Sequence, residues 1–131
     1  MKLGKYFTLA ELTVTNSGLI NAPNKAEIAN LTKLVVNVLD PLRELYGKPI
    51  HVNSGYRSPL VNRAVGGATT SEHLKGMAAD ISAGSKAENK KLFDLIRENL
   101  TFRQVINEYD YKWVHVSFNE SDNKKQVLAI K

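Results

Sequence analysis

The sequence predicts an α+β fold in which helices near the N-terminus pack on an antiparallel sheet. Between residues 24 and 47, apolar residues recur at spacings of three and four, as they do along one face of a helix. After residue 100, short segments rich in Val, Ile and Phe alternate apolar and polar positions, as strands do. The 131 residues, 43% of them apolar, suffice for one domain that spans residues 1–131.

The first half of the chain is predicted to be mainly helical. Thr8 to Glu11 forms a capping-box pattern, which opens a short helix. Asn24 can cap a long helix, and Gly47 is placed to end it. Pro41 lies inside the apolar stripe of that helix, so we expect the helix to kink or restart there.

Five strands are expected, at residues 50–53, 77–82, 102–107, 113–118 and 126–130. The third and fourth are predicted to form a hairpin across residues 108–112, and the last to add an edge strand. A second long helix should run from the capping box at Ser85 to about Leu100. Residues 54–70 are predicted to be mostly loop, with a short helix after Pro59.

Composition excludes several classes of protein. The chain has no cysteine, which excludes a disulfide framework, a thiol nucleophile and cysteine-ligated zinc. No apolar run approaches the roughly 18 residues of a membrane span, and the N-terminus lacks the apolar segment of a signal peptide. We therefore expect a protein that is cytoplasmic as made and that reaches a cell wall only if it is exported or released, with a bacterial or phage origin.

The net charge of +5 favours anionic partners such as cell-wall polymers. No pattern typical of nucleic-acid binding accompanies this charge, so nucleic acid is not an expected partner. We expect a monomer.

Three polar residues in apolar surroundings are candidates for a metal site. Asp80 lies in the predicted strand 77–82, His115 lies in the predicted strand 113–118, and His73 precedes the first of these. A carboxylate or an imidazole in such a strand needs a partner or an ion. Two imidazoles and one carboxylate form a ligand set typical of catalytic zinc, with water in the fourth position. On spacing alone, hydrogen-bonded structural residues are the more common interpretation.

Four motifs together resemble one known family. They are Ser-Gly-Tyr-Arg at residues 54–57, Val-Gly-Gly at 65–67, Ser-x-His with Asp seven residues later at 71–80, and Trp-Val-His-Val-Ser at 113–117. This set resembles the zinc D-Ala-D-Ala carboxypeptidase family of peptidoglycan peptidases. Its relatives include D-Ala-D-Ala dipeptidases, phage L-alanyl-D-glutamate endolysins and the hedgehog signalling domain. The likeness runs from about residue 7 to residue 118 and implies a hedgehog/D-Ala-D-Ala peptidase-like fold.

The resemblance implies roles for five residues. It makes His73, Asp80 and His115 the ligands of a Zn²⁺ ion. Arg57 is implied to bind carbonyl or carboxylate oxygens of the substrate, a task that suits a guanidinium group. Ser71 is implied to bond the substrate or the groups that support the ligands.

The resemblance does not assign the general base to one residue. The dipeptidases and endolysins carry a glutamate three residues before the last histidine, where this chain has Lys112. A carboxylate is still needed to take a proton from water and deliver it to the leaving amine. We prefer Glu108, which can face His115 across the hairpin. Asp110, in the hairpin turn, is the alternative.

The expected function is therefore zinc-dependent hydrolysis of an amide bond in peptidoglycan stem peptides. The enzyme would be a D-Ala-D-Ala carboxypeptidase or an L-Ala-D-Glu-type endopeptidase, with the peptidoglycan peptide as its partner. The alternative is a non-catalytic, zinc-containing module that binds the cell wall or belongs to a phage structure. Lys112, in place of the glutamate, would allow a non-catalytic module.

Overall fold

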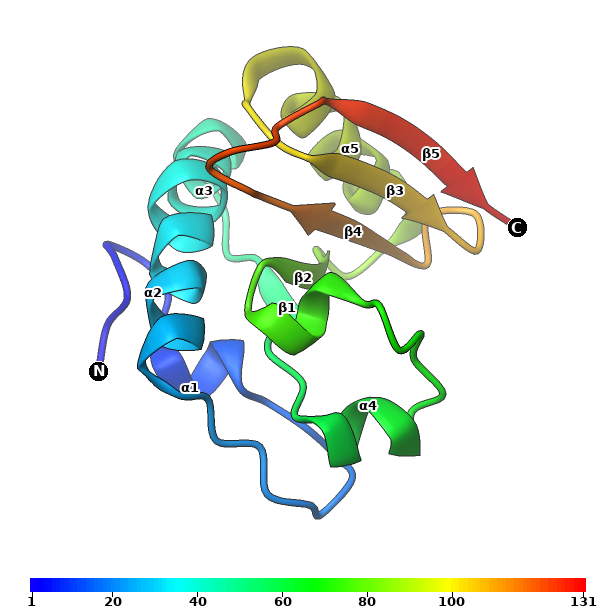
Figure 1. Ribbon diagram of the computed structural model, residues 1–131. Helices are drawn as coiled ribbons and strands as arrows, with labels where there is room; N and C mark the ends of the chain where they lie inside the picture. The colour runs from blue at the N-terminus through cyan, green and yellow to red at the C-terminus, as the bar shows by residue number, and fades with distance from the viewer.

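A five-stranded sheet with strand order β1-β2-β4-β3-β5 organises the computed structural model, which describes residues 1–131 (Figure 1). Each predicted strand is confirmed to within a few residues. The strands are β1 (His51–Ser54), β2 (Ala78–Ser82), β3 (Gln104–Glu108), β4 (Trp113–Ser117) and β5 (Gln126–Ile130).

The α+β class is confirmed, and one strand pair differs from the all-antiparallel expectation. β1, β2, β4 and β3 pair antiparallel in that order, whereas β5 runs parallel to β3. Residues 118–125 return the chain to the beginning of β3, where the Lys125 and Gln126 amides donate to the carbonyls of Phe102 and Arg103. A strand that begins beside the beginning of its neighbour must run in the same direction, so the sheet is mixed.

The N-terminal helices follow their local signals. Thr8 and Asn24 both complete capping boxes, at the starts of α1 (Leu9–Leu12) and α2 (Lys25–Leu34). The predicted restart at Pro41 is confirmed, because a π-helical segment, η1 (Val35–Leu39), leads into α3 (Asp40–Tyr46) with the proline in its first turn. Gly47 ends α3 in the left-handed conformation, with a φ of 75°.

The remaining helices are α4 (Pro59–Ala64), the 3₁₀ helix η2 (Glu72–Lys75) and α5 (Lys86–Asn99). Ser85 caps α5 as expected, but Glu88 does not return the bond and instead contacts Tyr46 and Lys48. η2 was not predicted from the sequence. None of the helices combines the length and the apolar character needed to cross a membrane.

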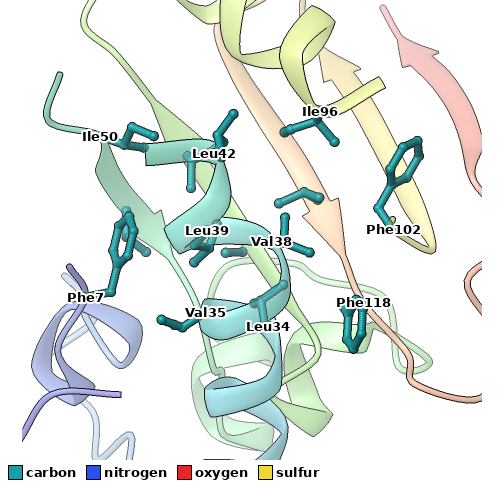
Figure 2. Close-up of a cluster of buried hydrophobic side chains, with 14 of the residues drawn as sticks. Phe7, Leu34, Val35, Val38, Leu39, Leu42, Ile50, Ile96, Phe102 and Phe118 are labelled. Atoms are coloured by element: carbon teal, nitrogen blue, oxygen red, sulfur yellow. The ribbon is translucent and has the colours of Figure 1, made fainter. Parts of the chain in front are cut away.

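The hydrophobic core lies between one face of the sheet and the helices α2, η1, α3 and α5 (Figure 2). Side chains alternate along a strand, so β2 and β4 direct every second residue toward this core. Ala79, Ile81, Val114 and Val116 are completely buried there. The strands are thereby held from one face, and their other side chains are free to form a site.

Candidate metal centre

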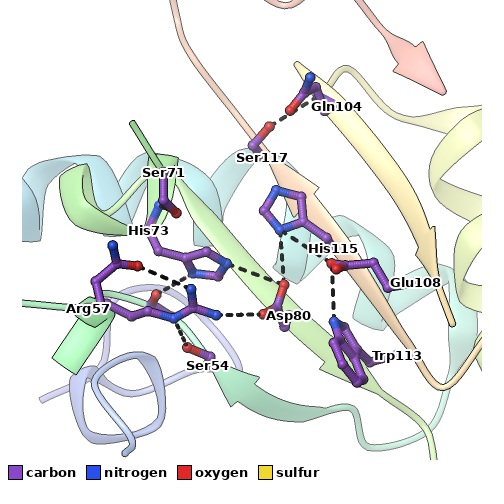
Figure 3. A network of polar contacts seen from close by, with 12 residues as sticks. Ser54, Arg57, Ser71, His73, Asp80, Gln104, Glu108, Trp113, His115 and Ser117 are labelled. Atoms are coloured by element: carbon purple, nitrogen blue, oxygen red, sulfur yellow. Dashed lines mark hydrogen bonds and ion pairs between the residues drawn. The ribbon is translucent and has the colours of Figure 1, made fainter. Parts of the chain in front are cut away.

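Three candidate ligands converge on the sheet face opposite the core (Figure 3). Asp80 on β2 and His115 on β4 are direct cross-strand partners, and His73 lies on η2, which packs against β2. The ligand atoms of all three lie within 4.8 Å of one another. The Asp80 Oδ1 atom is 3.0 Å from His115 Nδ1 and 3.3 Å from His73 Nε2. The structure thus brings together the three residues that the sequence pattern singled out.

The His73 ring is oriented by two neighbouring groups. The Ser71 hydroxyl caps η2 by accepting a hydrogen bond from the His73 amide at 3.2 Å. The His73 Nδ1 atom lies 2.7 Å from the carbonyl oxygen of Gly55. Because a carbonyl only accepts, Nδ1 donates a proton to it, and Nε2 is the ring atom left to bind a metal ion. His73 is therefore prepared to bind a metal ion through the atom that faces Asp80.

Gly55 is itself wedged against α1. A Cβ atom at this position would lie 2.3 Å from the carbonyl oxygen of Leu12, a distance that no side chain tolerates. The same Leu12 oxygen accepts the amide of Tyr56 at 2.7 Å. Glycine is needed here for close approach, and the Gly55 carbonyl is held where it meets His73.

Asp80 is a buried carboxylate with an ion-pair partner. Arg57 donates to its Oδ2 atom at 3.1 Å and to the Ser54 hydroxyl at 3.0 Å. Burial opposes ionisation of Asp80, but hydrogen bonds from His115 and His73 outweigh it and hold the pKa of Asp80 below its usual range. Asp80 is therefore ionised at neutral pH, as a metal ligand must be. Arg57 orients this ligand, and its contact with substrate stays a prediction.

Glu108 lies beside the three ligands. Its Oε2 atom is 4.0 Å from His115 Nδ1 and accepts a hydrogen bond from the Trp113 indole at 3.2 Å. Burial, together with the charge of Asp80, raises the pKa of Glu108 above its ordinary value. A carboxyl group whose pKa is raised in this way is suited to accept a proton and return it.

The alternative base, Asp110, points elsewhere. It lies in the exposed loop of the β3–β4 hairpin and pairs with Lys86 on α5. Lys112, three residues before His115, is also exposed. Of the two carboxylates considered from the sequence, only Glu108 lines the cavity that contains the ligands.

A buried asparagine that was not predicted from the sequence holds this hairpin. Tyr109, Asp110 and Tyr111 are all in the left-handed region, with φ between 52° and 61°. The Asn89 side chain on α5 donates to the carbonyls of Tyr111 and Lys112, at 2.9 and 3.1 Å. A polar residue on the apolar face of a predicted helix was the signal that could have identified it. Its bonds fix the turn that sets Glu108 opposite Trp113.

A cavity of about 310 Å³ opens over the ligands. Ser71 lines it, although the hydroxyl of Ser71 already caps η2, so its contact with substrate stays a prediction. Glu72, Ile106 and Ile130 also line the cavity, and none of them was predicted from the sequence. Glu72 pairs at 2.9 Å with Arg103, which joins η2 to the start of β3.

The donor set fits a zinc ion. Two donors bound to a tetrahedral zinc ion lie about 3.3 Å apart, close to the 3.0 and 3.3 Å between Asp80 Oδ1 and the two imidazole nitrogens. Three protein ligands leave one tetrahedral position open, which is the arrangement of catalytic rather than structural zinc. The cluster of His73, Asp80 and His115 is consistent with Zn²⁺.

Comparisons with known proteins agree with this site. The model of the peptidase M15 family matches residues 5–117, which include every candidate ligand and end before β5. Over 82 residues the chain is 44% identical to the zinc D-Ala-D-Ala carboxypeptidase of Streptomyces albus G. The aligned region covers 61% of this chain and 32% of that protein, so the chain spans about a third of the length of its relative.

Proposed function

This chain belongs to the peptidase M15 family, and on that premise we propose that it is a zinc-dependent peptidase acting on peptidoglycan stem peptides. One observation carries the proposal: His73, Asp80 and His115 converge in a cavity that also holds the carboxylate of Glu108. The name of the Streptomyces relative supports stem peptides as the substrate class. The cleaved bond is a terminal D-Ala-D-Ala amide or an internal L-Ala-D-Glu amide.

Each residue of the site has a task in amide hydrolysis. A zinc ion, when bound, supplies Lewis acidity that lowers the pKa of water and polarises the amide carbonyl. Glu108 takes the proton of the attacking water and returns it to the leaving amine. The Trp113 indole keeps the Glu108 Oε2 atom oriented for this transfer. Arg57, which lines the cavity, donates to a substrate oxygen that gains negative charge.

Peptide release from peptidoglycan tests the proposal. The zinc-loaded protein should release fragments that mass spectrometry detects, and a chelator should stop the release. Glu108→Gln should lower the rate by about 10²- to 10⁴-fold, because the amide keeps the size of the side chain but cannot accept the proton. Asp110→Asn is the matched control, since this carboxylate of the same hairpin pairs with Lys86 outside the cavity. It should leave the rate unchanged.

Two results would count against parts of this proposal. If the zinc-loaded wild type released nothing from walls of varied composition, the peptidase function would be wrong and a non-catalytic module would be favoured. If Glu108→Gln kept the full rate while Asp110→Asn lost it, the general base would be Asp110.

A further inference from the structure

We propose that Ile130 on β5, with Ile106 and Trp113, forms an apolar subsite beside Glu108 that takes a small aliphatic side chain of the substrate. The side chain belongs to a residue that adjoins the cleaved amide. This inference rests on the proposed peptidase function and specifies part of the substrate that the site selects.

The register of the sheet places Ile130 next to the candidate base. Glu108 pairs with Trp113 on β4 and with Ile130 on β5. Residues paired in adjacent strands project their side chains to the same face of a sheet. Glu108 is therefore flanked on both sides by large apolar side chains.

The three apolar residues border the same cavity as the ligands. Ile106, the register partner of His115, lines the cavity and is only 8% exposed. Ile130 is 43% exposed, so part of its surface remains available for contact. Burial of this surface against a substrate favours an aliphatic group. The neighbouring carboxylate of Glu108 disfavours an acidic group in the same place.

The position of Ile130 is fixed although β5 is exposed. β5 pairs with β3 along its whole length, as Figure 1 shows at the edge of the sheet. The Ile130 carbonyl accepts the Tyr109 amide at 2.7 Å, and the Gln104 and Gln126 side chains meet at 2.7 Å. The match to the family model ends at residue 117. Ile130 therefore lies outside the region that the family model matches, whereas Ile106 and Trp113 lie inside it. A substrate preference set by Ile130 can therefore be particular to this chain.

Synthetic stem peptides with alanine or leucine on either side of the cleaved bond test the subsite. The wild type should prefer alanine at one of the two positions, measured as the ratio of kcat/KM values. Ile130→Ala should reduce that preference by about tenfold, at the low end of what a few methylene groups give in an apolar pocket. Ile130→Phe should increase it. Val127→Ala is the matched control, because Val127 is 44% exposed on the opposite face of the same strand.

Thermal unfolding of each variant should first show that it is folded. An alanine preference that neither Ile130→Ala nor Ile130→Phe changes at either position would overturn this inference alone. The inference would also fail if Val127→Ala changed the preference as much as Ile130→Ala. A wild type that cleaves none of the peptides would overturn the proposed function, and the subsite with it.

Discussion

β4 and β5 both border the candidate site, but the surrounding protein holds them very differently. β4 has hydrogen-bonded neighbours on both sides, and its Val114 and Val116 are completely buried. β5 has a neighbour on one side only, and all five of its residues are exposed. The candidate ligand His115 lies on β4, whereas the cavity-wall residue Ile130 lies on β5.

If the proposed function and subsite hold, this difference separates the strand that carries a metal ligand from the strand that selects the substrate. Metal ligands must keep their relative positions within tenths of an ångström. A strand that is hydrogen-bonded to a neighbour on each edge supplies that rigidity. A cavity wall that selects a substrate side chain tolerates larger changes in the positions of its atoms. Substitutions on an exposed edge strand also cost little stability. Two of the three candidate ligands therefore lie on inner strands and the third on η2, whereas Ile130 lies at the edge of the sheet.

Loss of the ligands should give the largest effect. His115→Ala and His73→Ala should each reduce bound zinc from about one ion per chain to nearly none, because each removes one of three donors. His51→Ala is the control, since this third histidine is exposed on edge strand β1 and lies outside the cluster. Metal content after dialysis, measured by mass spectrometry, checks this. Full occupancy in His115→Ala would contradict the assignment of the ligands.

A smaller effect should separate two valines that face each other across β3 and β5. Val105 is completely buried, and its register partner Val127 is 44% exposed. Val105→Ala should lower the free energy of unfolding by about 2–3 kcal/mol, through lost burial and the cavity that remains. Val127→Ala should lower it by less than about 0.5 kcal/mol. Urea denaturation of both variants measures the contrast, and equal losses would show that β5 is as tightly packed as β3.

The smallest effect concerns a charged group far from the site. Hydrogen bonds from Lys48, Lys91 and Tyr46 lower the pKa of Glu88 to about 2, from an ordinary value of 4.5. Because the folded-state pKa is depressed, the resulting stabilisation is complete above pH 4.5 and is lost as the pH falls toward 2. The difference in unfolding temperature between wild type and Glu88→Gln should therefore narrow over this interval. A difference that stays constant with pH would contradict the role of this network.

The elements that could be predicted from the sequence depend on residues a few positions apart. Caps at Thr8 and Asn24, the restart at Pro41 and the alternation of the strands all act within one or two turns or a single strand. The direction of β5 could not be predicted in this way, because it depends on where residues 118–125 return along β3. η2 could not be predicted either, because it has only four residues and contacts residues 55 and 57, which are distant from it in sequence.

In the candidate site, too, the features that depend on local sequence could be predicted and those that depend on strand pairing could not. The motifs around His73, Asp80 and His115 predicted the candidate ligand set, because each motif is a short pattern that can be recognised in the sequence. The choice between Glu108 and Asp110 required the register of the hairpin, which Asn89 fixes from α5. Ile130 carried no signal at all, since only the pairing of β5 with β3 brings it to the cavity.

The glycine wedged beneath α1 gives the start of the chain a part in cofactor retention. Leu12 presses on Gly55, whose carbonyl keeps the His73 ring from rotating. Local unfolding of α1 would release that restraint. We therefore expect the zinc affinity to depend on the free energy of unfolding of α1. Because linkage is reciprocal, we expect a zinc ion bound by His73 to slow fraying and proteolysis of the first dozen residues.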